Sequence, residues 1–371
     1  SLTLGSPSDN NTRAGPVTLT VTYTGADNVT LVGDNVTISA TGTAAAGSKS
    51  VSGTGTESRT ITLDNLTGNG ALTVSIASGT ATDLAGNSAP TASASDNITV
   101  DNTAPSGLAL TVAGDDAYAT AQAVSLTLSG SDNHSVTGYF LSESSTTPSL
   151  DNFTSVTATD NYSASLGFTL SSGDGAKTVY GWLRDTAGNI GGSASDNISL
   201  DTTAPTVSVG SPSDNHSNSG PVSYTVSYTG ADNVTLVADN VTVTATGTAA
   251  AGSKSVTGSG TATRTITLDN LTGDGTLKVT IPAGTAFDNA SNTAPGAGPS
   301  TAFTVDNTLT VSLGSPSDNN TKAGPVTLTV TYTGADNVTL VGDNVTVSTT
   351  GTAAAGSKSV FGTGTESRTI T

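Results

Sequence analysis

The side chains of this 371-residue chain that could do chemistry are mostly aspartates, because it has no cysteine and only two histidines. Aspartates recur at matching places in loops and linkers: Asp27, Asp83, Asp101, Asp132, Asp185, Asp201, Asp232, Asp288, Asp306 and Asp336. Their carboxylates are hard oxygen ligands, which Ca²⁺ accepts in flexible geometry, whereas Mg²⁺ prefers to keep its waters. These residues are therefore candidate ligands of structural Ca²⁺. The alternative is that each aspartate only caps a turn through an Asx-type hydrogen bond.

A second pattern consists of asparagines that are followed two residues later by Ser or Thr. All of them directly follow an aspartate: Asn10, Asn28, Asn35, Asn65, Asn97, Asn133, Asn152, Asn161, Asn197, Asn215, Asn233, Asn240, Asn270, Asn289, Asn319, Asn337 and Asn344. Asn-x-Ser/Thr is the acceptor sequence for N-glycosylation on exposed surfaces of secreted proteins, so the pattern predicts a glycan coat. The alternative is that Asp-Asn favours tight turns, and duplication of repeats also multiplies each site.

Catalytic patterns are missing from the sequence, which predicts that the chain is not an enzyme. The serines lack a nucleophile-elbow pattern, and we interpret His134 and His216 as exposed turn histidines without partners. The Gly-Asp-Gly segments at 173–175 and 273–275 are typical of hairpin turns rather than phosphate-binding loops. The absence of cysteine excludes thiolate metal sites and disulfides. A net charge of −18 excludes nucleic acid as a partner, because its phosphates would be repelled.

The elements that must position these residues are repeated along the chain. Residues 1–62 return at 310–371 with 55 of 62 positions identical, and a related copy begins near residue 206. A fixed long period indicates an array of similar modules. We predict four segments: an Ig-like module at 1–104, a second kind of module at 105–204, a copy of the first kind at 205–308, and the N-terminal half of a further copy at 309–371.

Apolar residues alternate with polar ones within each module, as in PVTLTVTYT at 16–24 and ALTVSI at 71–76. Period-two alternation of Val, Ile, Leu and Thr is typical of half-buried strands, and no stretch keeps a helical period. A disordered Ser/Thr-rich stalk would not show such regular alternation. With about seven such runs per module, the pattern predicts an all-β protein of tandem Ig-like antiparallel β-sandwiches in an elongated array.

Several motifs resemble one family. The linkers DNTAP (101–105) and DTTAP (201–205), the ADNVTL segments and the loops TDLAGN (82–87) and RDTAGN (184–189) are similar to those of bacterial Ig-like tandem repeats. Such repeats occur in large secreted adhesins and surface fibres. The resemblance implies the Ig-like fold, an extracellular setting at the cell surface, and Ca²⁺ held by aspartates at module junctions. The loop FDNASN (287–292) departs from this form because it lacks the glycine.

The Ig-like topology predicts which aspartates meet. Because two loops and the incoming linker share one pole of such a sandwich, each junction should gather one aspartate from each. The predicted groups are Asp101 with Asp132 and Asp185, Asp201 with Asp232 and Asp288, Asp306 with Asp336, and Asp27 with Asp83. Without a cation these carboxylates would repel one another and loosen the junction.

The sequence therefore predicts an extracellular structural protein that forms a surface filament, sheath or adhesin stalk. Exposed edge strands would favour self-association into a fibre. Two alternatives remain at this point. The chain could be a module that binds cell-surface glycans through its loops or Trp182, or a spacer attached to a secreted enzyme. No apolar run is long enough to span a membrane.

Overall fold

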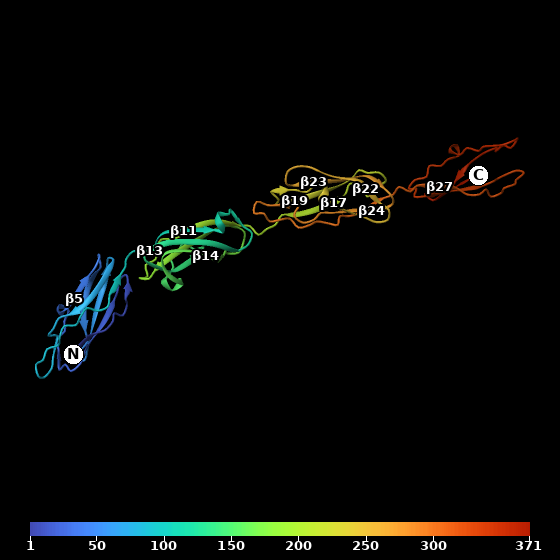
Figure 1. Cartoon of the computed structure of the whole chain (residues 1–371). Coiled ribbons are helices and arrows are strands. Elements are labelled where there is room, and N and C mark those ends of the chain that lie inside the picture. The colour runs from blue at the N-terminus through green and yellow to red at the C-terminus, as the bar shows by residue number, and fades with distance from the viewer. The chain divides into compact units, whose positions relative to one another are not determined.

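The computed structural model describes residues 1–371 and shows an all-β protein (Figure 1). The chain divides into two compact units, Ser1–Thr202 and Thr203–Thr371. The helical segments are five 3-10 turns of three residues each, and none of them is suited to crossing a bilayer. These turns are η1 (Gly33–Asn35), η2 (Ala113–Asp115), η3 (Leu150–Asn152), η4 (Ala238–Asn240) and η5 (Gly342–Asn344).

Residues 1–104 form two four-stranded sheets. The first has the order β1 (Leu2–Leu4), β3 (Val17–Tyr23), β7 (Ser58–Thr67) and β6 (Ala45–Ser52). The second has the order β2 (Asn11–Thr12), β10 (Ile98–Val100), β8 (Gly70–Ile76) and β5 (Val36–Ala40). A separate two-stranded ladder joins β4 (Asn28–Val29) and β9 (Ala81–Thr82). All pairs are antiparallel except β2 with β10.

The alternating sequence explains how these sheets bury their apolar side chains. In β3 the residues Val17, Leu19 and Val21 are fully buried, while the threonines between them are exposed or half-buried. Successive strand residues point to opposite faces, so every second residue enters the core between the two sheets. The predicted antiparallel β-sandwich is therefore confirmed in this part of the chain.

Residues 205–308 repeat this topology strand for strand. One sheet has the order β17 (Thr206–Pro212), β19 (Val222–Thr229), β23 (Thr263–Thr272) and β22 (Ala250–Thr257). The other has the order β18 (His216–Ser217), β26 (Phe303–Val305), β24 (Gly275–Thr280) and β21 (Thr242–Ala245), and a small ladder joins β20 (Asn233–Val234) to β25 (Ala286–Phe287). Residues 309–371 form one sheet, with the order β27 (Thr310–Leu313), β28 (Leu328–Thr333), β30 (Ser367–Ile370) and β29 (Val360–Phe361).

Residues 105–204 differ because their strands form one continuous ladder. Its order is β11 (Ser106–Val112), β13 (Ala123–Ser142), β15 (Gly175–Asp185), β16 (Ala194–Leu200) and β12 (Tyr118–Ala119), and β14 (Thr154–Thr169) pairs with β13. The long strand β13 pairs with β11 through its first half and with β15 through its second half. Asp132 lies between these two halves of β13, where the pairing register of the strand breaks.

Trp182 lies on the face of β15 that points away from the main core. Val179 and Leu183 enter the core of this module, whereas Trp182 packs beside Phe140, with ring centroids 5.9 Å apart. Phe153 covers the same face, and the Arg184 guanidinium lies 5.6 Å from its ring centroid. Trp182 is only 2% exposed. It therefore serves local packing and has no free ring face on which a sugar could stack.

The Gly-Asp-Gly segments are turns, but their interpretation as hairpin turns was wrong. Residues 273–275 connect β23 to β24, which belong to different sheets, and residues 173–175 connect β14 to β15, which do not pair. The glycines allow backbone conformations that a side chain would forbid. Gly273 has φ +73°, and a Cβ there would lie 2.1 Å from the Thr248 carbonyl oxygen.

Candidate metal centre

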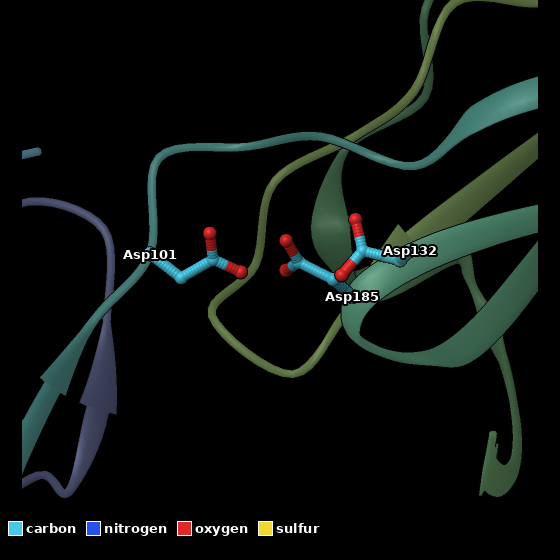
Figure 2. Close-up of side chains that lie close together, drawn as sticks. All are labelled: Asp101, Asp132 and Asp185. Atoms are coloured by element: carbon cyan, nitrogen blue, oxygen red, sulfur yellow. The ribbon is translucent and has the colours of Figure 1, made fainter. Parts of the chain in front are cut away.

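Three aspartates meet where residues 1–104 join residues 105–204. Asp101 follows β10, Asp132 lies within β13, and Asp185 ends β15. One carboxylate oxygen of each lies within 4.8 Å of the others, and the three residues are 2%, 7% and 2% exposed. Figure 2 shows Asp101 facing the other two carboxylates from the linker. The structure thus brings together one of the groups that the sequence predicted.

The hydrogen bonds of this cluster leave two buried oxygens without partners. Asp101 Oδ1 accepts the N–H of Thr103 at 3.0 Å, and Asp132 Oδ1 accepts the N–H of His134 at 2.7 Å. The Oδ2 atoms of Asp101 and Asp132 are buried and accept no hydrogen bond. An unpaired buried carboxylate oxygen is costly, because the group loses its hydration without compensation. The arrangement is incomplete without a proton or a cation.

Asn189 supports the third carboxylate and ties it to the linker. Asp185 accepts the backbone N–H of Asn189 at 2.8 Å and its side-chain Nδ2 at 2.7 Å. The same Nδ2 lies 2.8 Å from the carbonyl oxygen of Asp101. Asn189 therefore connects the loop that carries one candidate ligand with the linker that carries another. The sequence pattern D-x-A-G-N contained this residue, but its supporting role was not predicted.

His134 links the two modules beside the cluster. Its Nε2 lies 3.0 Å from Oδ1 of Asn11 on β2, and the residue is half-buried. The prediction of an exposed histidine without a partner was therefore wrong for His134. His216 is exposed, as predicted. Sequence reasoning missed the contact because Asn11 and His134 lie 123 positions apart and no local pattern pairs them.

Burial and mutual repulsion raise the pKa values of two members of the cluster. The pKa of Asp132 is raised mainly by burial, with further contributions from the charges of Asp185 and Asp101. The pKa of Asp185 is raised mainly by burial too, although the hydrogen bonds from Asn189 oppose the shift. Both shifts mean that the metal-free cluster resists carrying its full negative charge.

The raised pKa values predict a pH dependence for the metal-free protein. Below the ordinary value of 3.8 both the folded and unfolded states are protonated at Asp132 and Asp185. As pH rises above 3.8, the unfolded state releases these protons first, so the free energy of unfolding falls until the raised pKa values are passed. The measurement is the free energy of unfolding from urea titrations with a chelator present. We expect the value for the wild type to fall relative to that for Asp132→Asn as pH rises. A difference that stays constant between pH 3 and pH 7 would contradict it.

The same loop occurs elsewhere without the burial. Asp83 accepts the N–H and Nδ2 of Asn87, both at 2.8 Å, as Asp185 does from Asn189. The pKa of Asp83 is nevertheless lowered, chiefly by the side-chain hydrogen bond from Asn87. Burial, together with the charge of Asp101, thus reverses the direction of the pKa shift between two loops with the same hydrogen bonds.

The loop of 287–292 keeps this geometry although it lacks the glycine. Asp288 accepts the N–H of Asn292 at 2.8 Å and its Nδ2 at 3.1 Å. Ser291 takes the left-handed conformation, with φ +71°, where Gly86 and Gly188 have φ +80° and +85°. The departure from the family motif therefore does not abolish the loop.

The other predicted ligands form no such set within their own compact unit. Asp27 and Asp232 are exposed, and each accepts a backbone N–H of the neighbouring loop through Oδ2, at 2.8 Å and 3.0 Å. Asp306 and Asp336 are exposed as well. Within the first unit only Asp101, Asp132 and Asp185 meet as three, and within the second unit no three acidic side chains do. Asp201 belongs to the first unit and Asp232 and Asp288 to the second, so that group stays a prediction.

The asparagines of the Asp-Asn-x-Ser/Thr pattern are exposed, apart from the half-buried Asn35 and Asn240. Four of them also close 3-10 turns, because their Oδ1 accepts the N–H of the residue three positions earlier: Asn35, Asn152, Asn240 and Asn344. Asn65 and Asn270 adopt left-handed conformations, with φ +49° and +53°. The turn-forming interpretation is thus correct for the four in 3-10 turns, whereas Asn65 and Asn270 lie within β7 and β23. The suitability of these asparagines as glycan acceptors is a separate property.

Comparisons with known proteins give similarities of fold only. No protein-family model matches the chain, and no curated protein matches it by sequence. Similar solved structures include FdeC, an Escherichia coli adhesin (17% identity, 82% of this chain and 96% of that chain, TM-score 0.30). They also include a tetra-tandem repeat in the extending region of a large adhesion protein (24%, 89% and 80%, TM-score 0.27) and chicken CNTN1 FN1–FN3 domains (12%, 81% and 98%, TM-score 0.22). Bacterial adhesin repeats are thus among the structures with a similar fold, as the sequence motifs suggested.

Proposed function

We propose that this chain is a non-enzymatic part of a secreted, adhesin-like surface protein, in which Ca²⁺ stiffens the junction between modules. The observation that carries the proposal is the buried group of Asp101, Asp132 and Asp185, in which two carboxylate oxygens lack partners. A bound Ca²⁺ would supply two positive charges against three carboxylates and accept their free oxygens as ligands. No comparable grouping of nucleophile and base occurs among the sequence motifs.

The chain's own residues explain how such a site would act mechanically. Asp101 belongs to the linker, whereas Asp132 and Asp185 belong to the module that follows it. A cation shared by both sides resists bending, because opening the junction would separate charges that attract each other. Asn189 and His134 add hydrogen bonds across the same junction. The junction is thereby built from residues that are far apart in the sequence.

The test is calorimetric titration of the full chain with CaCl₂ after treatment with a chelator. We expect a binding event that disappears in Asp101→Asn and persists in Asp27→Asn, the matched control, because Asp27 is exposed and already accepts the Leu84 N–H. The thermal midpoint should rise with Ca²⁺ in the wild type and in the control. Absence of binding heat together with an unchanged midpoint would refute the calcium site.

We also propose that the protein self-associates through the edges of its sheets. The strands β6 and β22 each end a sheet and have no partner on their outer side. Unpaired strand edges are templates for pairing with another chain. Ordered polymers in electron micrographs of the purified chain would support this part of the proposal, and a monomer in sedimentation at high concentration would refute it.

Glycosylation is proposed at the exposed asparagines of the Asp-Asn-x-Ser/Thr pattern. Their exposure supports it, because an acceptor asparagine must be reached from solvent. Peptide mapping of protein from its native source should show occupancy at exposed sites such as Asn97. We expect lower occupancy at the half-buried Asn35 and Asn240, which serve as internal controls. An intact mass equal to that of the bare polypeptide would contradict glycosylation altogether.

A further inference from the structure

One side chain at the end of each module contacts the linker that follows it. The side chains belong to Asn69, Asp174 and Asp274, each of which lies between two glycines in a turn. In all three places Oδ1 accepts a backbone N–H of the linker: from Asn102 at 2.7 Å, from Thr202 at 2.9 Å and from Asn307 at 2.7 Å. Each contact lies within one compact unit. The three linkers differ in sequence, yet the contact is the same.

Further hydrogen bonds strengthen this contact. Asn69 Nδ2 donates to the Thr103 hydroxyl at 2.6 Å, and the Thr202 hydroxyl donates to Asp174 at 2.8 Å. The Thr308 hydroxyl donates to Asp274, and this hydrogen bond is the main cause of the lowered pKa of that carboxyl. The linker is thus held at two successive groups, a backbone N–H and a hydroxyl.

The turn cannot easily move its side chain away from the linker. Two hydrogen bonds join the backbone of Asn69 to Thr43. The Asn69 N–H donates to the Thr43 hydroxyl at 2.9 Å, and the Asn69 carbonyl oxygen accepts the Thr43 N–H at 2.8 Å. Gly68 has φ +77°, and a Cβ there would lie 2.0 Å from the Thr43 carbonyl oxygen. The backbone that carries Asn69 is therefore held by a neighbouring loop as well as by its own conformation.

We propose that Asn69, Asp174 and Asp274 are positioning residues that fix each linker to the module it leaves. At the first junction this fixation places Asp101 for the next module. Asp101 Oδ1 accepts the Thr103 N–H within the fixed linker, which leaves Oδ2 buried and without a hydrogen bond in a carboxylate that lies beside Asp132 and Asp185. The effect on cation affinity rests on the proposed calcium site, whereas the fixation of the linker does not.

The proposal is tested on the full chain with Asn69→Ala and Asn69→Asp. Alanine removes the acceptor, whereas aspartate keeps it and is the residue found at 174 and 274. In the presence of a chelator, we expect Asn69→Ala to speed amide hydrogen exchange at Asn102 by up to about tenfold, because this amide loses its hydrogen-bond acceptor. Asn69→Asp should exchange like the wild type. Thr103→Val, which removes only the linker hydroxyl, gives a second variant that leaves the turn intact.

The second measurement is Ca²⁺ affinity. We expect Asn69→Ala to weaken binding about five- to tenfold, and Asn69→Asp to restore it, although residue 69 is not a ligand. Unchanged exchange at Asn102 in both Asn69→Ala and Thr103→Val would overturn the proposal. Faster exchange at Asn102 with unaltered Ca²⁺ affinity would overturn the claim that fixation of the linker places Asp101 for cation binding. Faster exchange in a chain whose wild type binds no Ca²⁺ would support the fixation and refute the proposed calcium function.

Discussion

Replacing Asp132 by asparagine is expected to have opposite effects on stability with and without Ca²⁺. Asparagine keeps an oxygen that can accept the His134 N–H, but it carries no charge. In the metal-free protein the change removes a buried carboxylate that has an unpaired oxygen beside two other acids. We expect the first module junction to become more stable by about 1–2 kcal/mol, because the cost of burying that charge disappears.

With Ca²⁺ present the same substitution removes a charged ligand. A unit charge about 4 Å away contributes roughly 4 kcal/mol at an effective dielectric constant near 20, so we expect affinity to fall by at least about a hundredfold. The wild type should then be more stable than the variant at millimolar Ca²⁺. The measurement is hydrogen exchange of β13 amides, with and without a chelator, which reports on this part of the chain.

The control is Asp27→Asn, at the corresponding position of the first module. Asp27 is exposed, so its replacement should change stability by less than about 0.5 kcal/mol in either condition. A sign reversal that occurs only at Asp132 would identify the buried cluster as the site. Equal destabilisation of Asp132→Asn in both conditions would show instead that its carboxylate only caps the turn.

Replacing Trp182 by alanine is expected to cause the largest loss of stability in residues 105–204. The side chain is 2% exposed and packs with Phe140 and Tyr180, at ring-centroid distances of 5.9 Å and 6.0 Å. Removing a buried aromatic of this size costs about 3–5 kcal/mol, because contacts are lost and a cavity remains. Trp182→Phe should lose less stability than Trp182→Ala, because an aromatic ring still fills part of the space.

The effect should be confined to one module, so the readout must be local. Hydrogen exchange at β13 and β15 should speed up in Trp182→Ala, whereas exchange at β3 and β19 should not change. Tyr118→Ala is the matched control, since Tyr118 is 41% exposed and the change should cost much less. A loss below about 1 kcal/mol for Trp182→Ala would show that this aromatic cluster is not a second core.

The sequence was sufficient for the strands and for part of the candidate site. Period-two alternation is a local property, so β3 could be predicted from residues 16–24 alone. The group of Asp101, Asp132 and Asp185 could be predicted as well, because the order of linker and loops in an Ig-like sandwich brings them to one pole. Those predictions needed only the spacing of residues and a fold class.

Other features depended on contacts that no local pattern encodes. Asp27 and Asp132 occupy corresponding positions in the sequence of their modules, but only Asp132, within β13, is buried, beside the linker that carries Asp101. Asn11 and His134 meet across 123 positions, and Trp182 is buried because Phe140 and Phe153 cover the outer face of β15. Asn69 belongs to none of the motifs identified in the sequence, yet its side chain holds the next linker.

The physical reason is that residue type and period determine which way a side chain points, whereas burial depends on what packs against it from elsewhere in the chain. By itself, the sequence determined that this protein consists of repeated β-modules with acidic loops and linkers. Only the tertiary structure decided which of those carboxylates lose their water, and hence which of them have raised pKa values and which keep unpaired oxygens that a cation could bind.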